Sequence, residues 1–188
     1  MKKKLIVLCM MIIGLVLMFE AVQAQQPKRF SKEEIKSDLK YMHDTLDVVH
    51  YDLYAYTKKE VFDSAYNKIA SSINDSLTLM QVYRLFQPYL ALAKMSECVI
   101  FPQDGEYWGN YLPNGGTVFP LNLGFPKGKV IVKDNFSNEP QISKGDEITS
   151  FNKKKIKDFM EGVYNFMSGW NEYYKNSTLE KTNFSRFY

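Results

Sequence analysis

The chain has 188 residues, of which 45% are hydrophobic, 15% aromatic and 24% charged. This length fits one ordinary domain or two small ones, and the apolar fraction is enough for a packed core, which excludes wholesale disorder. The formal net charge of +3 is too small to indicate nucleic-acid binding, and two cysteines and two histidines exclude a disulfide-stapled miniprotein and a Cys/His zinc module. We expect no cofactor and no metal ligand.

Residues 1–24 are predicted to be a secretory signal peptide. Lysines at Lys2 to Lys4 precede an apolar run from Leu5 to Phe19, and Val22-Gln23-Ala24 supplies small residues at a cleavage site. A membrane anchor is the alternative, but the run is shorter than the roughly 20 residues that span a bilayer, and Cys9 lies too early for lipidation. The sequence therefore predicts an exported protein, periplasmic or extracellular, without a stable membrane anchor after cleavage.

Residues 25–96 are predicted to form an N-terminal module of three neighbouring helices. Each helix begins with a capping box, in which Ser or Thr is followed three residues later by Glu or Gln. The three pairs are Ser31–Glu34, Thr57–Glu60 and Thr78–Gln81. Apolar residues then recur at helical spacing. They are Ile35, Leu39, Met42, Leu46 and Val49 in the first helix, Val61, Ala65, Ile69 and Ile73 in the second, and Val82, Leu85, Phe86, Tyr89, Leu92 and Ala93 in the third.

The pattern changes from helix to strand after residue 96, so the predicted fold class is α+β. Residues 97–116 are interpreted as a connecting strand at Cys98 to Phe101 and a loop, and residues 171–188 as the truncated start of a further segment. Residues 117–170 are interpreted as a small β-rich module. Its predicted elements are strands at 117–123, 129–133 and 147–151, a turn at 126–128 and a helix at 155–167.

Candidate catalytic groups are present without the partners that catalysis needs. Ser96-Glu97-Cys98 offers two nucleophiles beside a carboxylate, but no histidine is near in sequence, so the cysteine is interpreted as a buried hydrophobic residue. Ser168 and Lys175 could imitate a serine–lysine dyad, but this serine lacks a strand-to-turn setting that would expose its oxygen. His43 and His50 are spaced poorly for chelating one metal ion. No catalytic residue is therefore predicted.

Residues 142–152 carry the most information in the chain. Gly145-Asp146-Glu147-Ile148, followed by Phe151-Asn152, resembles the G-D-x-I…(V/I)-N segment of PDZ-like domains, although Lys153 stands where a glycine is expected. The resemblance implies a groove that receives peptide or protein C-termini. The candidate peptide-binding residues are Phe119, Leu121, Val130, Val132, Gly145, Asp146 and Ile148. The alternative is that the segment is only a tight turn in a sheet without a groove.

A wider set of segments occurs in an order that resembles a family of exported proteases. The segments are His50 to Tyr56, Phe62-Asp63, Asp75 to Thr78 and Phe119 to Leu121, followed by the PDZ-like residues. This order resembles the amino-terminal half of S41-family serine peptidases, the tail-specific or C-terminal-processing proteases. In that family a D-G-H-T-like tetrad follows the third helix, but Met95 to Val99 reads Met-Ser-Glu-Cys-Val, so its role is not carried over. The family's catalytic serine and lysine lie in a C-terminal core, which is expected to begin beyond this sequence.

Three hypotheses for function follow. The first is a non-catalytic N-terminal fragment of an exported serine peptidase of this type, with a peptide-binding PDZ-like module. The second is a stand-alone periplasmic peptide-binding or adaptor protein, and the DNA beyond codon 188 would separate the two. The third, an unrelated exported hydrolase using Ser96, Glu97 or Cys98, is disfavoured because no base accompanies these residues. We expect the purified mature chain to cleave no peptide, and its oligomeric state is not predicted.

Overall fold

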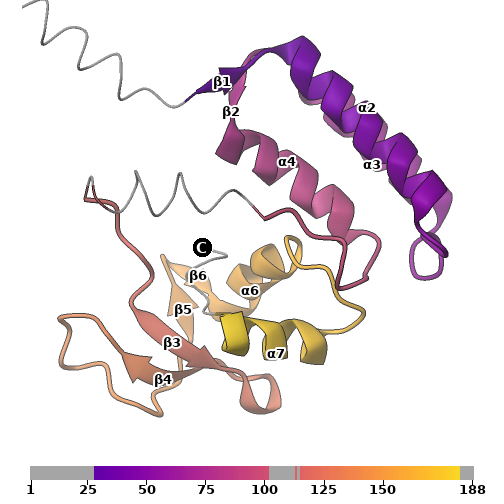
Figure 1. Ribbon diagram of the computed structural model, residues 1–188. Helices are drawn as coiled ribbons and strands as arrows, with labels where there is room; N and C mark the ends of the chain where they lie inside the picture. Colours follow the sequence, from indigo (N-terminus) through magenta and orange to yellow (C-terminus); the bar gives the residue numbers. More distant parts are fainter. Residues whose placement is uncertain (1–27, 102–112, 114, 183–188) are drawn as a thin grey trace, which may run out of the picture.

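The computed structural model describes residues 28–101, 113 and 115–182 (Figure 1). The expected signal peptide and most of the expected 97–116 connection lie outside the described residues. The described part is mixed α/β, with five α-helices and three two-stranded antiparallel sheets. The helices are α2 (Lys32–Val49), α3 (Lys59–Ser72), α4 (Leu79–Ala91), α6 (Ile156–Tyr164) and α7 (Glu172–Thr182). The strands are β1 (Arg29–Phe30), β2 (Leu77–Thr78), β3 (Leu121–Gly124), β4 (Ile131–Asn135), β5 (Ser150–Phe151) and β6 (Lys154–Lys155).

Two of the three predicted capping boxes are confirmed. Ser31 caps α2 and Thr78 caps α4, and in each case the N3 side chain, Glu34 or Gln81, accepts a hydrogen bond from the cap backbone. The prediction for Thr57 is wrong, because α3 starts one residue later with Lys58 as its N-cap and without a side-chain cap hydrogen bond. A Ser or Thr three residues before a Glu or Gln therefore marks a helix start in this chain only when the helix begins at the residue after that Ser or Thr.

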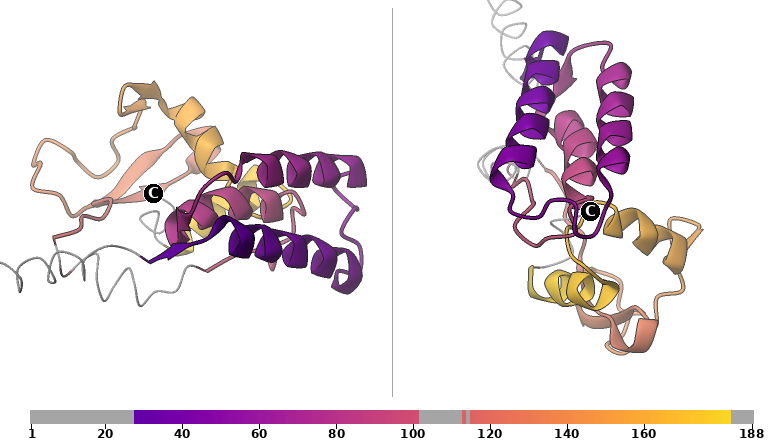
Figure 2. Two further views of the ribbon diagram at one scale, coloured as in Figure 1. Left: turned by 90° about the horizontal axis from the view of Figure 1, so that it is seen from above. Right: turned by 90° about the vertical axis from the view of Figure 1, so that its right-hand side faces the viewer.

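Helices α2, α3 and α4 pack as neighbours, and we call residues 28–101 the helical region (Figure 2). The fully buried apolar side chains of this region include Ile35, Leu39, Phe62, Ile73 and Tyr89. Two predicted core positions are wrong: Val49 is 70% exposed at the end of α2, and Val61 is 45% exposed. The buried face of α3 passes through Phe62 instead. The short β1–β2 ribbon, with Phe30 opposite Leu77, ties the start of α2 to the start of α4.

Residues 115–182, the strand-containing region, are built around β3 and β4. These strands pair antiparallel across a three-residue 3₁₀ turn at Pro126–Gly128, which confirms the predicted turn. The predicted strands are confirmed only in part, because β3 begins at Leu121 and the third is shortened to β5, which forms a hairpin with β6. Helix α6 covers one face of the β3–β4 sheet. Its Met160 and Val163 side chains are buried in the same core as Leu121, Leu123 and Val132.

The segment from Gly145 to Ile148 lies along the second edge of β4. The Gly145 amide donates to the Val132 carbonyl at 2.8 Å, and the Val132 amide donates to the Asp146 carbonyl at 2.9 Å. The Ile148 amide donates to the Val130 carbonyl at 2.8 Å, and Ile131 forms a bridge with Glu147. Strand β4 is therefore a central strand, with β3 on one side and the segment from Gly145 to Ile148 on the other.

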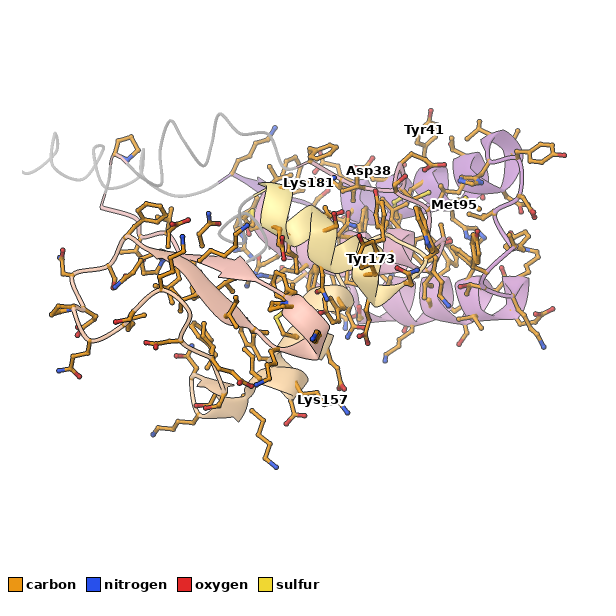
Figure 3. The ribbon with its side chains drawn as sticks, turned by 90° about the horizontal axis from the view of Figure 1, so that it is seen from below. Asp38, Tyr41, Met95, Lys157, Tyr173 and Lys181 are labelled. Carbon is orange, nitrogen blue, oxygen red and sulfur yellow. The ribbon has the colours of Figure 1, made fainter. Side chains whose placement is uncertain are left out.

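Helix α7 was not predicted from the sequence, yet it belongs to the core of the strand-containing region. Leu179 is only 1% exposed and packs in the cluster that contains Leu121 and Val132. The rest of the helix consists of two tyrosines and of polar and charged side chains, so the sequence shows no apolar stripe that would predict a helix. Lys181 and Tyr173 are labelled on this helix in Figure 3, which also shows Tyr41 projecting from the outer face of α2.

A buried polar contact joins the two regions. The Gln87 side chain, in α4, is fully buried; its amide nitrogen donates to the Phe166 carbonyl at 2.9 Å, and its amide oxygen accepts from the Ile100 N–H at 2.7 Å. The Ser168 hydroxyl donates to the Cys98 carbonyl. The predicted strand at Cys98 to Phe101 is therefore wrong: this stretch is irregular, and two of its backbone groups pair with side chains instead of a strand.

Candidate functional site

The outer edge of β3 is a sheet edge at which backbone groups face away from the neighbouring strand. The amide and carbonyl of Val132 both pair with residues 145–146, away from β3. In an antiparallel ladder, residues directly opposite each other either exchange backbone hydrogen bonds or both turn their amide and carbonyl away from the partner strand. Val132 belongs to a pair of the second kind. Leu123 is the partner of Val132, so its amide and carbonyl face the outer edge, as do those of Leu121 two residues earlier. In the described part of the chain, no strand pairs with this edge.

A carboxylate already occupies one amide at this edge. The Phe125 amide, two residues beyond Leu123, donates to Oε1 of Glu180 on α7 at 2.9 Å. The other oxygen of Glu180 lies 3.8 Å from the Lys133 ammonium. An ionised acceptor makes a backbone hydrogen bond roughly twice as strong as a neutral one. The edge thus has one backbone donor that binds a carboxylate, and α7 supplies that carboxylate.

The seven candidate peptide-binding residues lie together around β4, in three different settings. Leu121, Val130 and Val132 are at most 8% exposed, so their side chains face the core. Phe119 and Ile148 are half-buried against the same core, and Phe119 contacts Phe151. Three of the seven candidate side chains therefore pack inside the fold, and the peptide-binding role of the set stays a prediction.

Gly145 and Asp146 form the turn that leads the chain onto the second edge of β4. Gly145 has a φ of 94°, which favours glycine, and the Asp146 carboxylate accepts the Ser143 amide at 2.8 Å. The following hairpin turn has left-handed φ values of 48° at Asn152 and 65° at Lys153. Lysine thus adopts the conformation that the glycine expected in PDZ-like sequences would adopt with less strain.

Glu180 was missed by sequence reasoning. It is 55 positions from its partner Phe125, and its neighbours on α7 show no apolar periodicity. The contact depends on where α7 packs against β3, which local sequence does not encode. A glutamate beside the lone buried leucine of a polar helix was the only available signal.

The structure brings a histidine to the Ser96-Glu97-Cys98 segment that sequence proximity did not reveal. Nε2 of His50 lies 3.9 Å from Oε1 of Glu97, and the Ser96 hydroxyl donates to the other oxygen of Glu97 at 3.0 Å. The carboxylate lies between the hydroxyl and the imidazole, whereas an activated serine needs the imidazole as its own hydrogen-bond partner. This order of groups does not generate a nucleophile.

The shifted pKa values of Glu97 and Cys98 also oppose catalysis. The Glu97 carboxylate accepts hydrogen bonds from the Glu97 backbone amide and from the Ser96 hydroxyl, and these bonds hold its pKa below the usual value. The carboxylate is therefore a weak base. Burial, and then the charge of Glu97, raise the pKa of the Cys98 thiol, so the thiol stays protonated at neutral pH. Cys98 is 6% exposed and packs beside Leu90 and Ala93, as expected for a buried hydrophobic residue.

The remaining catalytic candidates have structural partners. Ser168 is bonded to the Cys98 carbonyl and Lys175 to the Tyr164 carbonyl, so each member of the imagined dyad has a different partner. Nδ1 of His43 lies 2.5 Å from the Tyr89 hydroxyl, and its ring stacks on Tyr66 at 4.5 Å. His43 therefore joins the three helices of the helical region.

Among the residues that the structure describes, no group of three or more His, Cys, Asp and Glu side chains could hold a metal ion. No helix in the same residues is long and apolar enough to cross a bilayer. No known family model matches the chain, and no curated protein matches it.

Proposed function

We propose that this chain is the non-catalytic, peptide-binding part of an exported serine peptidase that resembles the tail-specific proteases. In this proposal the helical region is a three-helix scaffold, and the strand-containing region is a PDZ-like module that receives peptide C-termini. The observation that supports it is the outer edge of β3, where the backbone amides and carbonyls of Leu121 and Leu123 face outward and the next outward amide, that of Phe125, already binds a carboxylate.

A peptide would bind by adding a strand to this edge. Main-chain hydrogen bonds to Leu121 and Leu123 would provide affinity independent of the peptide sequence. The terminal carboxylate would take the place of Glu180 at the Phe125 amide, with Lys133 as the nearby cation. Glu180 thus competes with the ligand, and α7 keeps the edge closed until a peptide displaces that side chain.

Peptide hydrolysis is not part of the proposal. Ser96, Cys98 and Ser168 are the nucleophile candidates of the sequence, and each lacks an imidazole or amine partner in the described residues. We expect purified residues 25–188 to bind peptides and cleave none. Turnover that survives removal of contaminating proteases would contradict this.

The test is binding of two hexapeptide pools with randomised last three residues, one with free and one with amidated C-termini. We expect the free-acid pool to bind and the amidated pool to bind about tenfold more weakly, because one charge-assisted hydrogen bond is lost. Glu180→Ala should increase affinity for the free-acid pool, and Glu172→Ala on the same helix is the matched control. Equal binding of both pools, or binding of neither, would contradict the proposal.

The second candidate is a stand-alone periplasmic adaptor that uses the same edge. Both candidates predict the same binding, so the DNA beyond codon 188 separates them. An open frame that encodes a Gly-rich turn with a serine, and a lysine roughly 25 residues later, would favour the peptidase, as the resemblance implies. An unrelated gene after a clean stop would favour the adaptor.

A further inference from the structure

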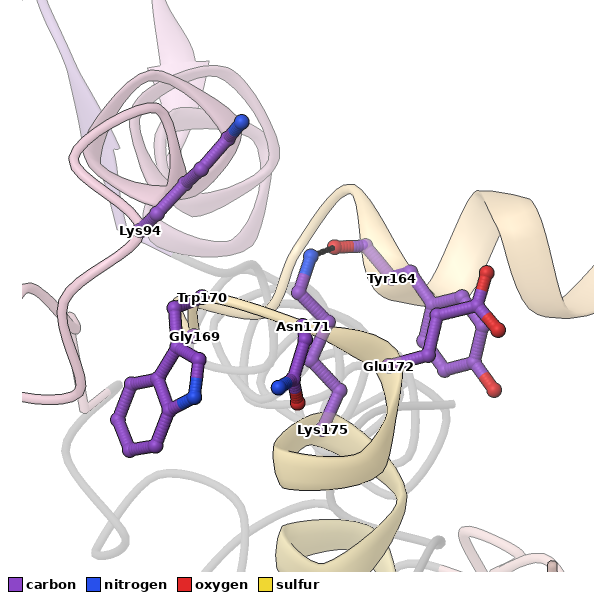
Figure 4. A pocket seen from close by; sticks show the side chains of 7 residues that line it. All are labelled: Lys94, Tyr164, Gly169, Trp170, Asn171, Glu172 and Lys175. Atoms are coloured by element: carbon purple, nitrogen blue, oxygen red, sulfur yellow. Dashed lines mark hydrogen bonds between the residues drawn. The ribbon is translucent and has the colours of Figure 1, made fainter. Parts of the chain in front are cut away.

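A cavity of about 190 Å³ lies where the end of the helical region meets the start of α7 (Figure 4). Its walls come from three separated stretches of the chain. Lys94 follows α4, Tyr164 ends α6, and residues 169–175 lead into α7 and form its first turn. The cavity is separate from the outer edge of β3 and contains none of the residues that the proposed function uses.

Lys175 supplies a positive charge to this cavity. Its ammonium is half-buried, donates one hydrogen bond to the Tyr164 carbonyl at 2.9 Å and lies 5.9 Å from the Tyr164 ring centre. In the described part of the chain, no carboxylate forms an ion pair with it. An ammonium has three donors, so two remain for a ligand.

The charges around Lys175 leave the cavity with a net positive charge of one. Burial, followed by the positive charge of Lys94, lowers the pKa of Lys175, while the negative charge of Glu172 raises it. In Figure 4 the Lys94 ammonium points away from the other lining side chains, so Lys94 acts at longer range. A monoanion would neutralise this net charge.

An aromatic surface forms the other side of the cavity. Trp170 is 53% exposed, and its ring lies 4.3 Å from that of Tyr174. A Cβ at Gly169 would lie 2.5 Å from the Tyr174 ring, so the chain needs glycine at this point for Trp170 and Tyr174 to stack. An exposed, supported indole face beside a cation suits a ligand with both a ring and a negative charge.

We propose that this cavity binds a small aromatic monocarboxylate, with the carboxylate on the Lys175 ammonium and the ring on Trp170. The volume is below the roughly 300–1,000 Å³ of sites for drug-sized ligands, which limits the ligand to about one ring. The proposal does not depend on peptide binding at β3, because the two sites share no residue.

The test follows the fluorescence of Trp170 during titration with phenylacetate, in a Trp108→Phe background that removes the other tryptophan. Phenylacetamide is the neutral control and inorganic phosphate the non-aromatic anion. We expect saturable binding of phenylacetate that is at least tenfold tighter than that of phenylacetamide. Lys175→Gln keeps a donor for the Tyr164 carbonyl but removes the charge, and we expect it to weaken phenylacetate binding about tenfold.

Lys181→Gln, on the same helix but outside the cavity, is the matched control and should leave binding unchanged. Glu172→Gln should tighten binding, because it removes the opposing negative charge. Equal binding of phenylacetate and phenylacetamide, no saturable binding, or equal effects of Lys175→Gln and Lys181→Gln would overturn the proposal. Phosphate binding as tight as that of phenylacetate would overturn the role given to Trp170.

Discussion

The helical region and the strand-containing region differ in how far apart along the chain their defining contacts lie. In the helical region, two of three helices begin at a capping box, and each box is closed within four residues of chain. In the strand-containing region, β4 is held by partners on both edges, and α7 is fixed by contacts with β3 far earlier in the chain. Local patterns therefore define the first region, while the second depends on pairings between distant segments.

The largest expected effect tests whether α7 is part of the strand-containing core. Leu179→Ala removes a side chain that is 1% exposed among Leu121, Val132 and Met160. We expect a loss of about 3 kcal/mol in the free energy of unfolding, from lost burial and the remaining cavity. Urea denaturation measures this, with Lys181→Ala as the control. A loss below about 1 kcal/mol would show that α7 contributes little to that core.

The next effect concerns the contact between the regions. Gln87→Leu leaves the Phe166 carbonyl and the Ile100 amide without partners, and we expect a cost of about 2 kcal/mol. In the Trp108→Phe background, urea unfolding followed by circular dichroism and by Trp170 fluorescence should then give separate midpoints for the two regions. Arg84→Leu, on the exposed face of α4, should preserve coincident midpoints. Coincident transitions in Gln87→Leu would mean that other contacts couple the regions.

A smaller effect separates a real cap from an apparent one. Ser31→Ala removes the cap of α2 and should cost about 1 kcal/mol, whereas Thr57→Ala should change stability little because Lys58 is the N-cap of α3. Both variants are compared with the parent by thermal unfolding. Equal losses at the two positions would contradict the cap assignment.

The smallest effect lies in the hairpin between β5 and β6. Lys153 has a φ of 65°, so Lys153→Gly should relieve backbone strain and stabilise the protein by about 0.5 kcal/mol. Lys154→Gly, in β6, should destabilise it, because glycine weakens a strand interior. Thermal denaturation of the pair decides this, and stabilisation by both substitutions would contradict the role of the turn.

The sequence predicted the features whose partners are close along the chain. The caps at Ser31 and Thr78, the turn at Pro126–Gly128 and the helix beginning near residue 155 are of this kind. Thr57 failed because the spacing of a capping box can occur beside a helix that starts in another register. The apolar run from Cys98 to Phe101 predicted a strand, whereas its backbone pairs with the side chains of Gln87 and Ser168.

The peptide-binding role of the seven candidate residues stays a prediction, and the sequence pattern indicated only part of the proposed site. The PDZ-like pattern directed attention to β4 and to Gly145–Ile148, which do pair. It could not show that this pairing fills the second edge of β4, nor that Glu180 reaches the Phe125 amide from α7. Both facts depend on how separated elements pack, and neither leaves a periodic signal in the sequence.

The most direct test of the account is to map where a peptide binds, by amide chemical shifts and hydrogen exchange in the ¹⁵N-labelled mature protein. With the free-acid hexapeptide pool, we predict shifts and slowed exchange at Leu121, Leu123 and Phe125, with larger changes in Glu180→Ala. Binding that instead perturbs the amides around Lys94 and Lys175, or leaves all three β3-edge amides unchanged, would contradict the claim that this edge is the peptide site.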